Sequence, residues 1–417
     1  MKNMIRLGLT VVLFSFSHLL ADVLYVTNVG SNTVTVIDPS TNSVTGTIIV
    51  GQHPIDIALT PDKRFAYVPN ANSNTVSIFD TSTNAVIATV TVGAIPDSVA
   101  IRPDGVSAYI VNEVSHSVSV INTTSHLVTA TIVIPGVNPD SRLAVVSPDS
   151  TSLYVTNNLA NNVVKINTST NMIVATISLT NALGIAITPN GQSLFVSNFG
   201  GGIVNVIDTT TNLVTATITT TGTPFFITIS PNGRFAYVSN FGLNAVQVID
   251  TTSHLIVATI VGGGTLPAYT AFNGNGSLAY VANSGTNNVS VINTSNNTIT
   301  ATITSADFVS PRGVAYLTPA IPSPFGPSGE QIKNIFLTQT ELVNVIFWNA
   351  PTNFTPVVYR LYRDAALTVL AGQVSGSTLE FEDHNRRKKQ LYSYFIIAVD
   401  QSGNTLNIGN VTVVPIS

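Results

Sequence analysis

Charged and aromatic side chains that depart from the pattern of the rest of the chain are the candidates for chemistry in this sequence. Carboxylate and guanidinium groups bind polar ligands through charge-assisted hydrogen bonds, and aromatic faces offer a surface on which a ring can stack. We expect one ligand-binding site to be formed by Asp56, Asp97, Glu113, Asp140, Arg142, Phe199, Phe225, Phe241, Tyr269 and Arg312, with His53 and Phe226 beside them. Such a set suits a polar ligand with an apolar side, such as a sugar.

Motifs for catalysis or metal binding are missing from the sequence. The chain has no Cys, and its histidines after residue 21 have no metal-ligand spacing. We therefore predict no metal and no cofactor, and His126 and His254 are interpreted as turn residues. A Gly-x-Ser-x-Gly nucleophile elbow and a phosphate loop are also absent, so an enzyme has no motif behind it.

A repeated pattern must position the candidate residues. An aromatic residue, then Val or Ile, any residue and Asn recur at residues 25–28, 67–70, 109–112, 154–157, 195–198, 237–240 and 280–283, at intervals of 42, 42, 45, 41, 42 and 43. Such a period, with four short β patterns in each copy, is typical of a β-propeller blade. In the second copy we expect strands at 55–60, 65–68, 75–79 and 86–92, with both faces of the third and fourth strands buried between neighbouring sheets.

The strand order at the two ends predicts a closed ring. The first copy starts with a second strand at residues 23–27, and the missing first strand follows the seventh copy at residues 311–319. The sequence therefore predicts an all-β fold, a seven-bladed propeller closed by this C-terminal strand and followed by a β-sandwich. The loops that join fourth to first strands and second to third strands share one face, the channel mouth, and the candidate residues belong there.

The Tyr-Val-Thr-Asn tetrapeptide at residues 25–28 and 154–157 resembles the YVTN family of seven-bladed propellers, over about residues 22–319. The resemblance implies the fold and a secreted or cell-surface protein, without fixing a role. The recurring Asn residues are interpreted as local turn formers at strand ends. Asp38, Asp80, Asp208 and Asp250, with Asn122, Asn167 and Asn293 at the same repeat position, are likewise assigned to turns.

The two ends of the chain differ from the repeats. Lys2, Arg6 and the apolar stretch that follows predict a signal peptide over residues 1–21, cleaved before Asp22. Residues 320–329 form a Pro/Gly/Ser linker, and residues 330–417 resemble a fibronectin type III domain, with Trp348 in the core and Tyr392 at a tyrosine corner. We thus expect an exported protein, periplasmic, secreted or on the cell surface, with no transmembrane segment after cleavage.

Three functions are compatible with these features. We favour a non-enzymatic binding or scaffold protein that recognises a protein or glycan partner, or a small polar ligand, at the channel mouth. We expect it to be a monomer. A net charge of −4 without a basic face argues against a nucleic-acid partner. The alternatives are a lactonase-like hydrolase that uses Asp97, Asp140 or Glu113, and a structural envelope or surface-layer component. If these residues have only a structural role, they form ion pairs at the rim and aromatic packing between blades.

Overall fold

The computed structural model describes residues 22–136 and 141–318, and the strands of the C-terminal part. The chain divides into two units, residues 1–320 and residues 321–417. Of the residues so described, no helix has the length and apolar character to cross a bilayer.

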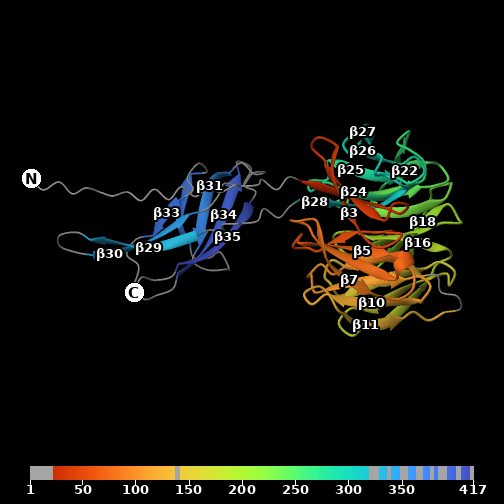
Figure 1. The fold of residues 1–417 in the computed structure, drawn as a ribbon, viewed down its shortest axis with the longest axis horizontal. Coiled ribbons are helices and arrows are strands. Elements are labelled where there is room, and N and C mark those ends of the chain that lie inside the picture. Colours follow the sequence, from red (N-terminus) through yellow and green to blue (C-terminus); the bar gives the residue numbers. More distant parts are fainter. Residues whose placement is uncertain are drawn as a thin grey trace, which may run out of the picture. The chain divides into compact units, whose positions relative to one another are not determined.

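Seven four-stranded antiparallel sheets make up the first unit and are arranged as the blades of a propeller (Figure 1). Strand β28 pairs with β1, with Tyr25 opposite Ala315. The C-terminal strand of the propeller is therefore the innermost strand of the N-terminal blade. The prediction of a closed seven-bladed ring is confirmed. We number the blades from this one: blade 1 holds β28 and β1–β3, and blades 2 to 7 hold β4–β7, β8–β11, β12–β15, β16–β19, β20–β23 and β24–β27.

Each blade contributes one strand to each of four concentric positions. The innermost strands are β28 (Pro311–Leu317), β4 (Ala58–Leu59), β8 (Pro96–Ile101), β12 (Ser141–Val146), β16 (Ala182–Ile187), β20 (Pro224–Ile229) and β24 (Pro267–Phe272). The second strands are β1 (Val23–Asn28), β5 (Phe65–Asn70), β9 (Ser107–Asn112), β13 (Ser152–Asn157), β17 (Ser193–Asn198), β21 (Phe235–Asn240) and β25 (Leu278–Asn283). The third strands are β2 (Thr33–Asp38), β6 (Thr75–Asp80), β10 (Ser117–Asn122), β14 (Asn162–Asn167), β18 (Ile203–Asp208), β22 (Ala245–Asp250) and β26 (Asn288–Asn293). The outermost strands are β3 (Ser43–Ile49), β7 (Ala85–Thr91), β11 (Val128–Val133), β15 (Met172–Ser178), β19 (Val214–Thr219), β23 (Ile256–Val261) and β27 (Thr298–Thr304).

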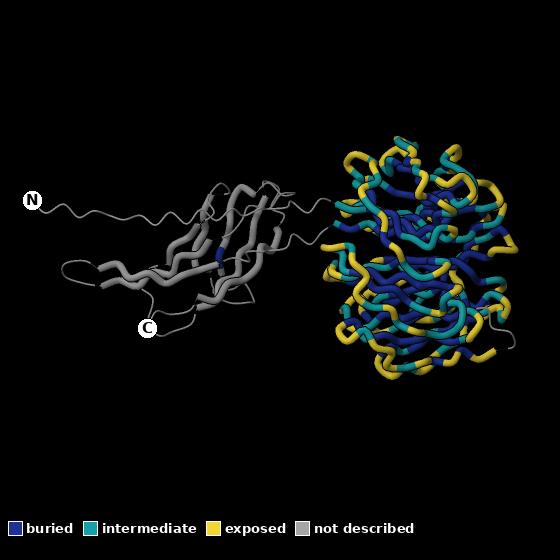
Figure 2. Tube along the Cα trace, in the orientation of Figure 1, coloured by how far each residue is buried: buried dark blue, intermediate teal, exposed yellow. Residues whose placement is uncertain are grey.

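Burial falls from the middle strands to the outermost ones (Figure 2). The second and third strands are buried on both faces, because each sheet is stacked between two others. The outermost strands alternate exposed and covered residues, as in β23, where Ile260 is buried and Val261 is exposed. The prediction that fourth strands are buried on both faces is therefore wrong, since their outer edge lies at the perimeter, where neighbouring sheets diverge.

The inner strand of blade 2 is shorter than predicted. Regular pairing covers only Ala58–Leu59, with an isolated bridge between Pro54 and Asn70, instead of residues 55–60. The Asp56 carboxylate accepts the backbone N–H of Ile57, and Pro69 on the neighbouring strand has no N–H to donate. The inner strands of the other blades also have a register shift at this place, but their pairing resumes on both sides of it.

Recurring polar side chains tie the blades together. The tyrosine of the repeat reaches the turn between the third and fourth strands of the next blade, where Tyr25 donates to Asn84 Oδ1 and Tyr67 contacts His126 Nδ1 at 3.0 Å. His126 and His254 lie in these turns with positive φ, as predicted. The turn assignments of the Asp residues and their Asn counterparts are also confirmed, since each side chain accepts backbone N–H groups two or three residues on, as in Asp38, Asp80, Asn122, Asn167, Asp208, Asp250 and Asn293.

The recurring Asn residues behave differently from the prediction in part of the ring. Asn198 and Asn240 do accept a backbone N–H three residues on, which is a local turn. In the five other blades the Asn amide donates across to hydroxyl or amide oxygens on the third strand, as Asn70 does to Thr75 and Ser77. The same arrangement is found at Asn28, Asn112, Asn157 and Asn283, and Asn240 also donates to Gln247 in this way. At these positions the Asn amide connects the second strand to the third through side-chain hydrogen bonds.

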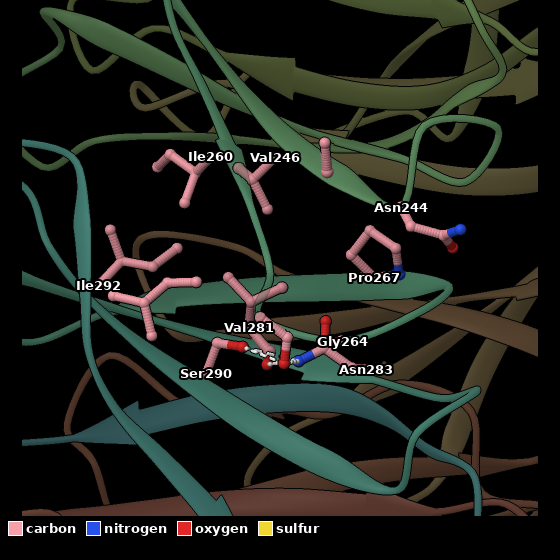
Figure 3. A pocket seen from close by; sticks show the side chains of 12 residues that line it. Asn244, Val246, Ile260, Gly264, Pro267, Val281, Asn283, Ser290 and Ile292 are labelled. Atoms are coloured by element: carbon pink, nitrogen blue, oxygen red, sulfur yellow. Dashed lines mark hydrogen bonds between the residues drawn. The ribbon is translucent and has the colours of Figure 1, made fainter.

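Figure 3 shows a small cavity between blades 6 and 7, where Val246 and Ile260 face Val281 and Ile292, and Asn283 bonds to Ser290. Its volume of about 10 Å³ is close to the space of a single water. This cavity is a packing gap and offers no room for an organic ligand.

The second unit contains two antiparallel sheets. One has the order β29 (Ser328–Ile335), β30 (Thr340–Phe347) and β33 (Glu380–Asp383). The other has the order β32 (Leu370–Ser375), β31 (Pro356–Tyr362), β34 (Tyr392–Asp400) and β35 (Thr405–Val413). Tyr392 is the first residue of β34, and Trp348 lies outside the described residues.

Candidate functional site

Nine of the ten candidate residues are described, and they occupy only three positions of the repeat. The second residue of an inner strand provides Asp97, Arg142, Phe225 and Arg312. The third residue provides Tyr269, and Asp56 has the same place after the Pro54 bridge. The residue after the recurring Asn provides Glu113, Phe199 and Phe241. Asp140 lies outside the described residues.

Backbone hydrogen bonds place these three positions on the same face. The loop after each second strand donates to the loop that enters the inner strand, as Glu113 N does to Ile95 O and Phe241 N to Thr223 O. Inner strands of neighbouring blades lie side by side around the ring. Side chains from all seven blades can therefore meet at the channel mouth although they are far apart in the sequence.

A hydroxyl bridge between blades is present at some inner strands and missing at others. The residue before the recurring Asn is Thr or Ser in four blades, and its hydroxyl donates to the next inner strand, as Ser197 does to Phe225 O and Ser239 to Ala268 O. Thr27 and Thr156 make the same contact. The remaining blades have Pro69, Val111 and Ala282, which cannot donate. Asp56, Asp97, Arg142, Tyr269 and Arg312 lie on the inner strands that border these three blades.

The Asp56 carboxylate lies between two inner strands. Oδ1 accepts the Ile57 N–H at 2.8 Å, and Oδ2 accepts the Val99 N–H of blade 3 at 3.0 Å. Burial raises the pKa of Asp56 to about 6, and the nearby charge of Asp97 adds to this, while the backbone donors oppose it. The carboxyl group thus takes the structural place of the missing hydroxyl and brings a titratable group under the channel mouth.

Tyr269 faces this carboxylate from blade 7. Burial, followed by the charges of Asp56 and Asp97, raises the pKa of Tyr269 well above its usual value. Its hydroxyl is shielded from solvent and interacts with the Asp56 carboxyl, although the geometry falls short of a regular hydrogen bond. The hydroxyl therefore keeps a hydrogen-bonding capacity that a ligand or a water can satisfy.

Arg142 connects the other two acids of the site. Its Nη1 lies 2.8 Å from Glu113 Oε2 and 3.8 Å from Asp97 Oδ2. Asp97 is almost fully buried, whereas Arg142 and Glu113 are partly exposed. The three side chains form a partly exposed charged group that spans blades 3 and 4.

The aromatic residues form one continuous cluster. Phe225 stacks on Phe241 with ring centroids 4.5 Å apart, and Phe199 meets Phe225 edge-on at 5.3 Å. Phe226, beside Phe225 on the same strand, lies 3.9 Å from the Tyr269 ring. Phe226 is buried, while Phe199 keeps 37% of its surface exposed. The cluster therefore runs from the buried inner ring to solvent at the channel mouth.

Arg312 lies against the aromatic cluster. Its guanidinium lies 5.6 Å from the Phe226 centroid and 5.9 Å from that of Phe225, within the range of a cation–π contact. It makes no ion pair with any residue in the described part of the chain, and its Nε is buried without a hydrogen-bond partner. Burial, and then the positive charge of Arg312, lowers the pKa of His53, so the imidazole beside the guanidinium favours the neutral form.

The structure thus brings the charged and aromatic candidates together, with Tyr269 as the link between Phe226 and Asp56. Sequence reasoning missed two features. It did not identify Asp56 as a bridge between blades, and it did not connect the missing hydroxyls at Pro69, Val111 and Ala282 with the place where the charged residues gather. The second feature could have been found by aligning the residue before the recurring Asn across the seven repeats.

The opposite face carries wider grooves between turns. One, of about 730 Å³, is lined by Asp149, Tyr154, Lys165, Gln192 and neighbouring turn residues. Lys165 already donates to Thr209 O at 2.9 Å and lies over the Tyr154 ring. An equivalent groove of about 520 Å³ recurs at blades 2 and 3 around Asp62 and Phe65. Because the grooves arise from the repeat itself, they mark the spaces between turns rather than a specialised site.

Two family models match different parts of the propeller. The YNCE-like beta-propeller model matches residues 5–114, and the cytochrome D1 heme domain model matches residues 129–317. Among curated proteins, the PE-PGRS family protein PE_PGRS18 of Mycobacterium tuberculosis is 60% identical over 38 residues, which is 9% of this chain and 8% of that protein. The chain therefore spans only a small part of that relative.

Solved structures match a larger share of the chain. Kuenenia stuttgartiensis hydrazine synthase matches with a TM-score of 0.60 and 25% identity, over 65% of this chain and 92% of that chain. A functionally unknown protein from Desulfotomaculum acetoxidans matches with a TM-score of 0.64 and 19% identity, over 71% and 99%. The dihydro-heme d1 dehydrogenase NirN matches with a TM-score of 0.52 and 15% identity, over 70% and 74%. The chain is similar to these proteins in its propeller fold.

The names of one family model and one solved structure raise the question of a haem. Haem iron is usually held by His, Cys, Met or Tyr. In the described part of the chain, no inner strand carries His, Cys or Met. Of the inner-strand tyrosines, Tyr316 donates to Asp22, and the ring of Tyr269 packs against Phe226 with its hydroxyl toward Asp56. The inner ring therefore does not fit a haem ligand set.

Proposed function

We propose that this protein is an exported, non-enzymatic binding propeller that recognises a small polar ligand with an apolar side, such as a sugar, at its channel mouth. The observation that carries the proposal is a buried Arg312 Nε without a hydrogen-bond partner, and a Tyr269 hydroxyl whose contact with Asp56 is not a regular hydrogen bond, next to a continuous aromatic cluster. Other buried side-chain atoms without a hydrogen-bond partner include Arg102 Nε, His116 Nδ1 and Thr220 Oγ1. At the channel mouth such groups adjoin the aromatic cluster, where a ligand can use them.

The chemistry of the cluster suits a sugar ring. Stacked Phe225 and Phe241, with Phe199 at their edge, offer an apolar surface on which the C–H face of a sugar packs. Arg312 and the Tyr269 hydroxyl donate hydrogen bonds, and the partly exposed Glu113 can accept them from hydroxyl groups. Since Arg142 holds Glu113 and Asp97 in place, little side-chain entropy is lost on binding.

A glycan array followed by calorimetric titration tests the proposal. We expect Phe241→Ala and Arg312→Ala each to weaken binding of the selected sugar by at least roughly tenfold, which corresponds to about 1.4 kcal/mol, with the melting temperature nearly unchanged. Arg64→Ala is the matched control, because Arg64 lies 5.1 Å over the Phe65 ring on the opposite face. If no glycan binds the wild-type chain, or if Arg64→Ala weakens binding as much, the proposal fails.

A lactonase-like hydrolase is supported less well by the same geometry. Asp97 and Glu113 both contact Arg142, and Asp56 accepts two backbone N–H groups, so these carboxylates are already engaged. Hydrolysis of a lactone panel that Asp97→Asn abolishes would favour the hydrolase over the binding protein.

The two ends of the chain complete the proposal. We propose that residues 1–21 direct export and are removed before Asp22, which N-terminal sequencing of the exported protein would test. For the second unit, the strand orders β29-β30-β33 and β32-β31-β34-β35 support a fibronectin type III-like sandwich, which serves as a spacer or a second contact.

A further inference from the structure

The charged side chains at the channel mouth are not equally satisfied. Arg142 Nη1 lies 2.8 Å from Glu113 Oε2 and 3.8 Å from Asp97 Oδ2. The Asp56 carboxylate accepts two backbone N–H groups. By contrast, the guanidinium of Arg312 makes neither an ion pair nor a hydrogen bond with any residue of the described ranges. Among the charges that the structure describes at the mouth, Arg312 is therefore the one that lacks a counter-charge.

The repeat does not require a cation at this place. Arg312 is the second residue of the inner strand β28. The same position in other blades holds residues of every polarity, namely Asp97, Leu183, Phe225 and Ala268. The blade fold therefore does not explain the charge. Because a half-buried guanidinium without a partner is costly, a bound anion would stabilise it.

The guanidinium of Arg312 is held on one side and open at its end. Its Cζ lies 5.6 Å from the Phe226 centroid and 5.9 Å from the Phe225 centroid. Nε is buried without a partner, whereas the two Nη atoms also have no partner but are not buried. Two parallel N–H donors of this kind match the two oxygens of a carboxylate. Since the phenyl rings already restrict the side chain, little entropy is lost when a carboxylate binds.

The electrostatic surroundings of Arg312 favour a single negative charge. The positive charge of Arg312 is the largest cause, after burial, that lowers the pKa of His53, and the opposing effect of Asp97 is smaller. On the other side, the charges of Asp56 and Asp97 raise the pKa of Tyr269 more than Arg312 lowers it. These two acids oppose a second negative charge nearby, and a phosphate ester carries close to two at neutral pH. A carboxylate therefore suits the position better than a phosphate.

We propose that the ligand of the channel mouth is an acidic sugar, whose carboxylate pairs with Arg312 while its ring packs against the aromatic cluster. This inference rests on the proposed function, since it names the class of ligand for the same site. Arg312 adjoins Phe225, which stacks on Phe241, so a carboxylate attached directly to a sugar ring reaches the guanidinium from the cluster. A neutral sugar fills the aromatic part of the site but leaves Arg312 without a counter-charge.

Calorimetric titration of the full chain with matched sugars tests the inference. The methyl glycosides of glucuronic, galacturonic and mannuronic acid are each compared with their methyl ester and with the parent neutral hexoside. We expect at least one acid to bind roughly tenfold more tightly than its ester, which is about 1.4 kcal/mol, and added salt to reduce this difference. If neutral sugars or esters bind as tightly as the acids, the inference fails and the proposed sugar site stands. If no sugar binds, both fail.

Variants of Arg312 assign the preference to this side chain. Arg312→Gln removes the charge and should abolish the preference for the acid over its ester, whereas Arg312→Lys keeps the charge and should retain part of it. Arg64→Gln is the matched control, because Arg64 also lies over a phenyl ring, that of Phe65, but on the opposite face. A preference that survives Arg312→Gln, or that Arg64→Gln removes, would place the carboxylate elsewhere. A hexose phosphate that binds more tightly than every uronic acid would also overturn the inference.

Discussion

Asp56 Oδ2 accepts a hydrogen bond from the backbone N–H of Val99 at 3.0 Å and so connects the inner strands of blades 2 and 3. The carboxyl group is buried and its pKa is raised to about 6, mainly by desolvation. The carboxyl group that connects blades 2 and 3 is therefore also one that is costly to ionise in the folded protein.

The raised pKa predicts a stability that falls as the pH rises. The folded state favours the neutral carboxyl group of Asp56. The stability that results is fully present below the unfolded pKa near 3.8 and is lost as the pH rises through the folded pKa of about 6. A shift of this size corresponds to roughly 3 kcal/mol. His53, whose pKa is lowered, acts in the opposite direction in this range. We therefore expect the informative quantity to be the difference between wild type and Asp56→Asn, measured by urea unfolding.

The unfolding free energy of Asp56→Asn should rise relative to that of the wild type between pH 4 and pH 7, and the difference should stay constant above pH 7. Asp208→Asn is the control, because hydrogen bonds from Thr211 lower the pKa of Asp208 and its effect belongs below pH 4. Parallel curves for wild type and Asp56→Asn across this range would contradict the role assigned to Asp56.

Ring closure by β28 predicts a sharp boundary for truncation. Tyr316 in β28 stacks on Tyr280 and donates to Asp22 Oδ2 at 2.6 Å. A chain that ends after Ser305 loses β28 and leaves the inner edge of β1 open, so we expect aggregation or a severe loss of stability. A chain that ends after Ala320 should retain a folded propeller. Similar melting curves for the two truncations would disprove closure by this strand.

The hydroxyl bridges between blades are expected to contribute to stability one at a time. Ser239→Ala leaves Ala268 O without its donor at 2.6 Å and should cost about 1–3 kcal/mol in unfolding free energy. Ser239→Thr keeps the hydroxyl, as Thr27 and Thr156 do naturally, and should cost much less. Equal losses for both variants would mean that shape, rather than the hydrogen bond, matters at this position.

The C-terminal unit is predicted to have a tryptophan core. If residues 329–417 form a sandwich that contains Trp348, this segment should unfold cooperatively by itself, and Trp348→Ala should cost roughly 3–5 kcal/mol. Because Trp348 is the only Trp in the chain, its emission reports on its surroundings without interference. A solvent-like emission maximum in the native protein would contradict the buried position.

The ring could be predicted from the sequence because every blade repeats the same local pattern, and because the unmatched strands at the two ends have one simple partner each. The exposure of the outer strands could not, since Val, Ile and Thr alternate in β23 much as they do in buried strands. The role of Asp56 also escaped prediction, because its partner Val99 belongs to the next blade. Contacts between blades depend on how the sheets stack, and the sequence of one repeat does not encode this.

The site could be located but not resolved in detail. Residues that differ between blades at the channel mouth were predicted to gather, and Phe225, Tyr269 and Arg312 do lie in one connected cluster. That Arg312 lies within cation–π distance of two phenyl rings, while Arg142 binds Glu113, follows from side-chain packing. A list of charged positions does not contain this distinction.

Side-chain NMR of the arginines tests the central claim, ligand binding at the channel mouth, most directly. The Nε–H signal of Arg312, assigned by its loss in Arg312→Lys, should shift on addition of the sugar selected on the array, because the buried Nε gains a partner or a new environment. The Arg64 signal on the opposite face should stay in place. A saturated complex in which Arg64 shifts and Arg312 does not would place the ligand elsewhere and contradict the account.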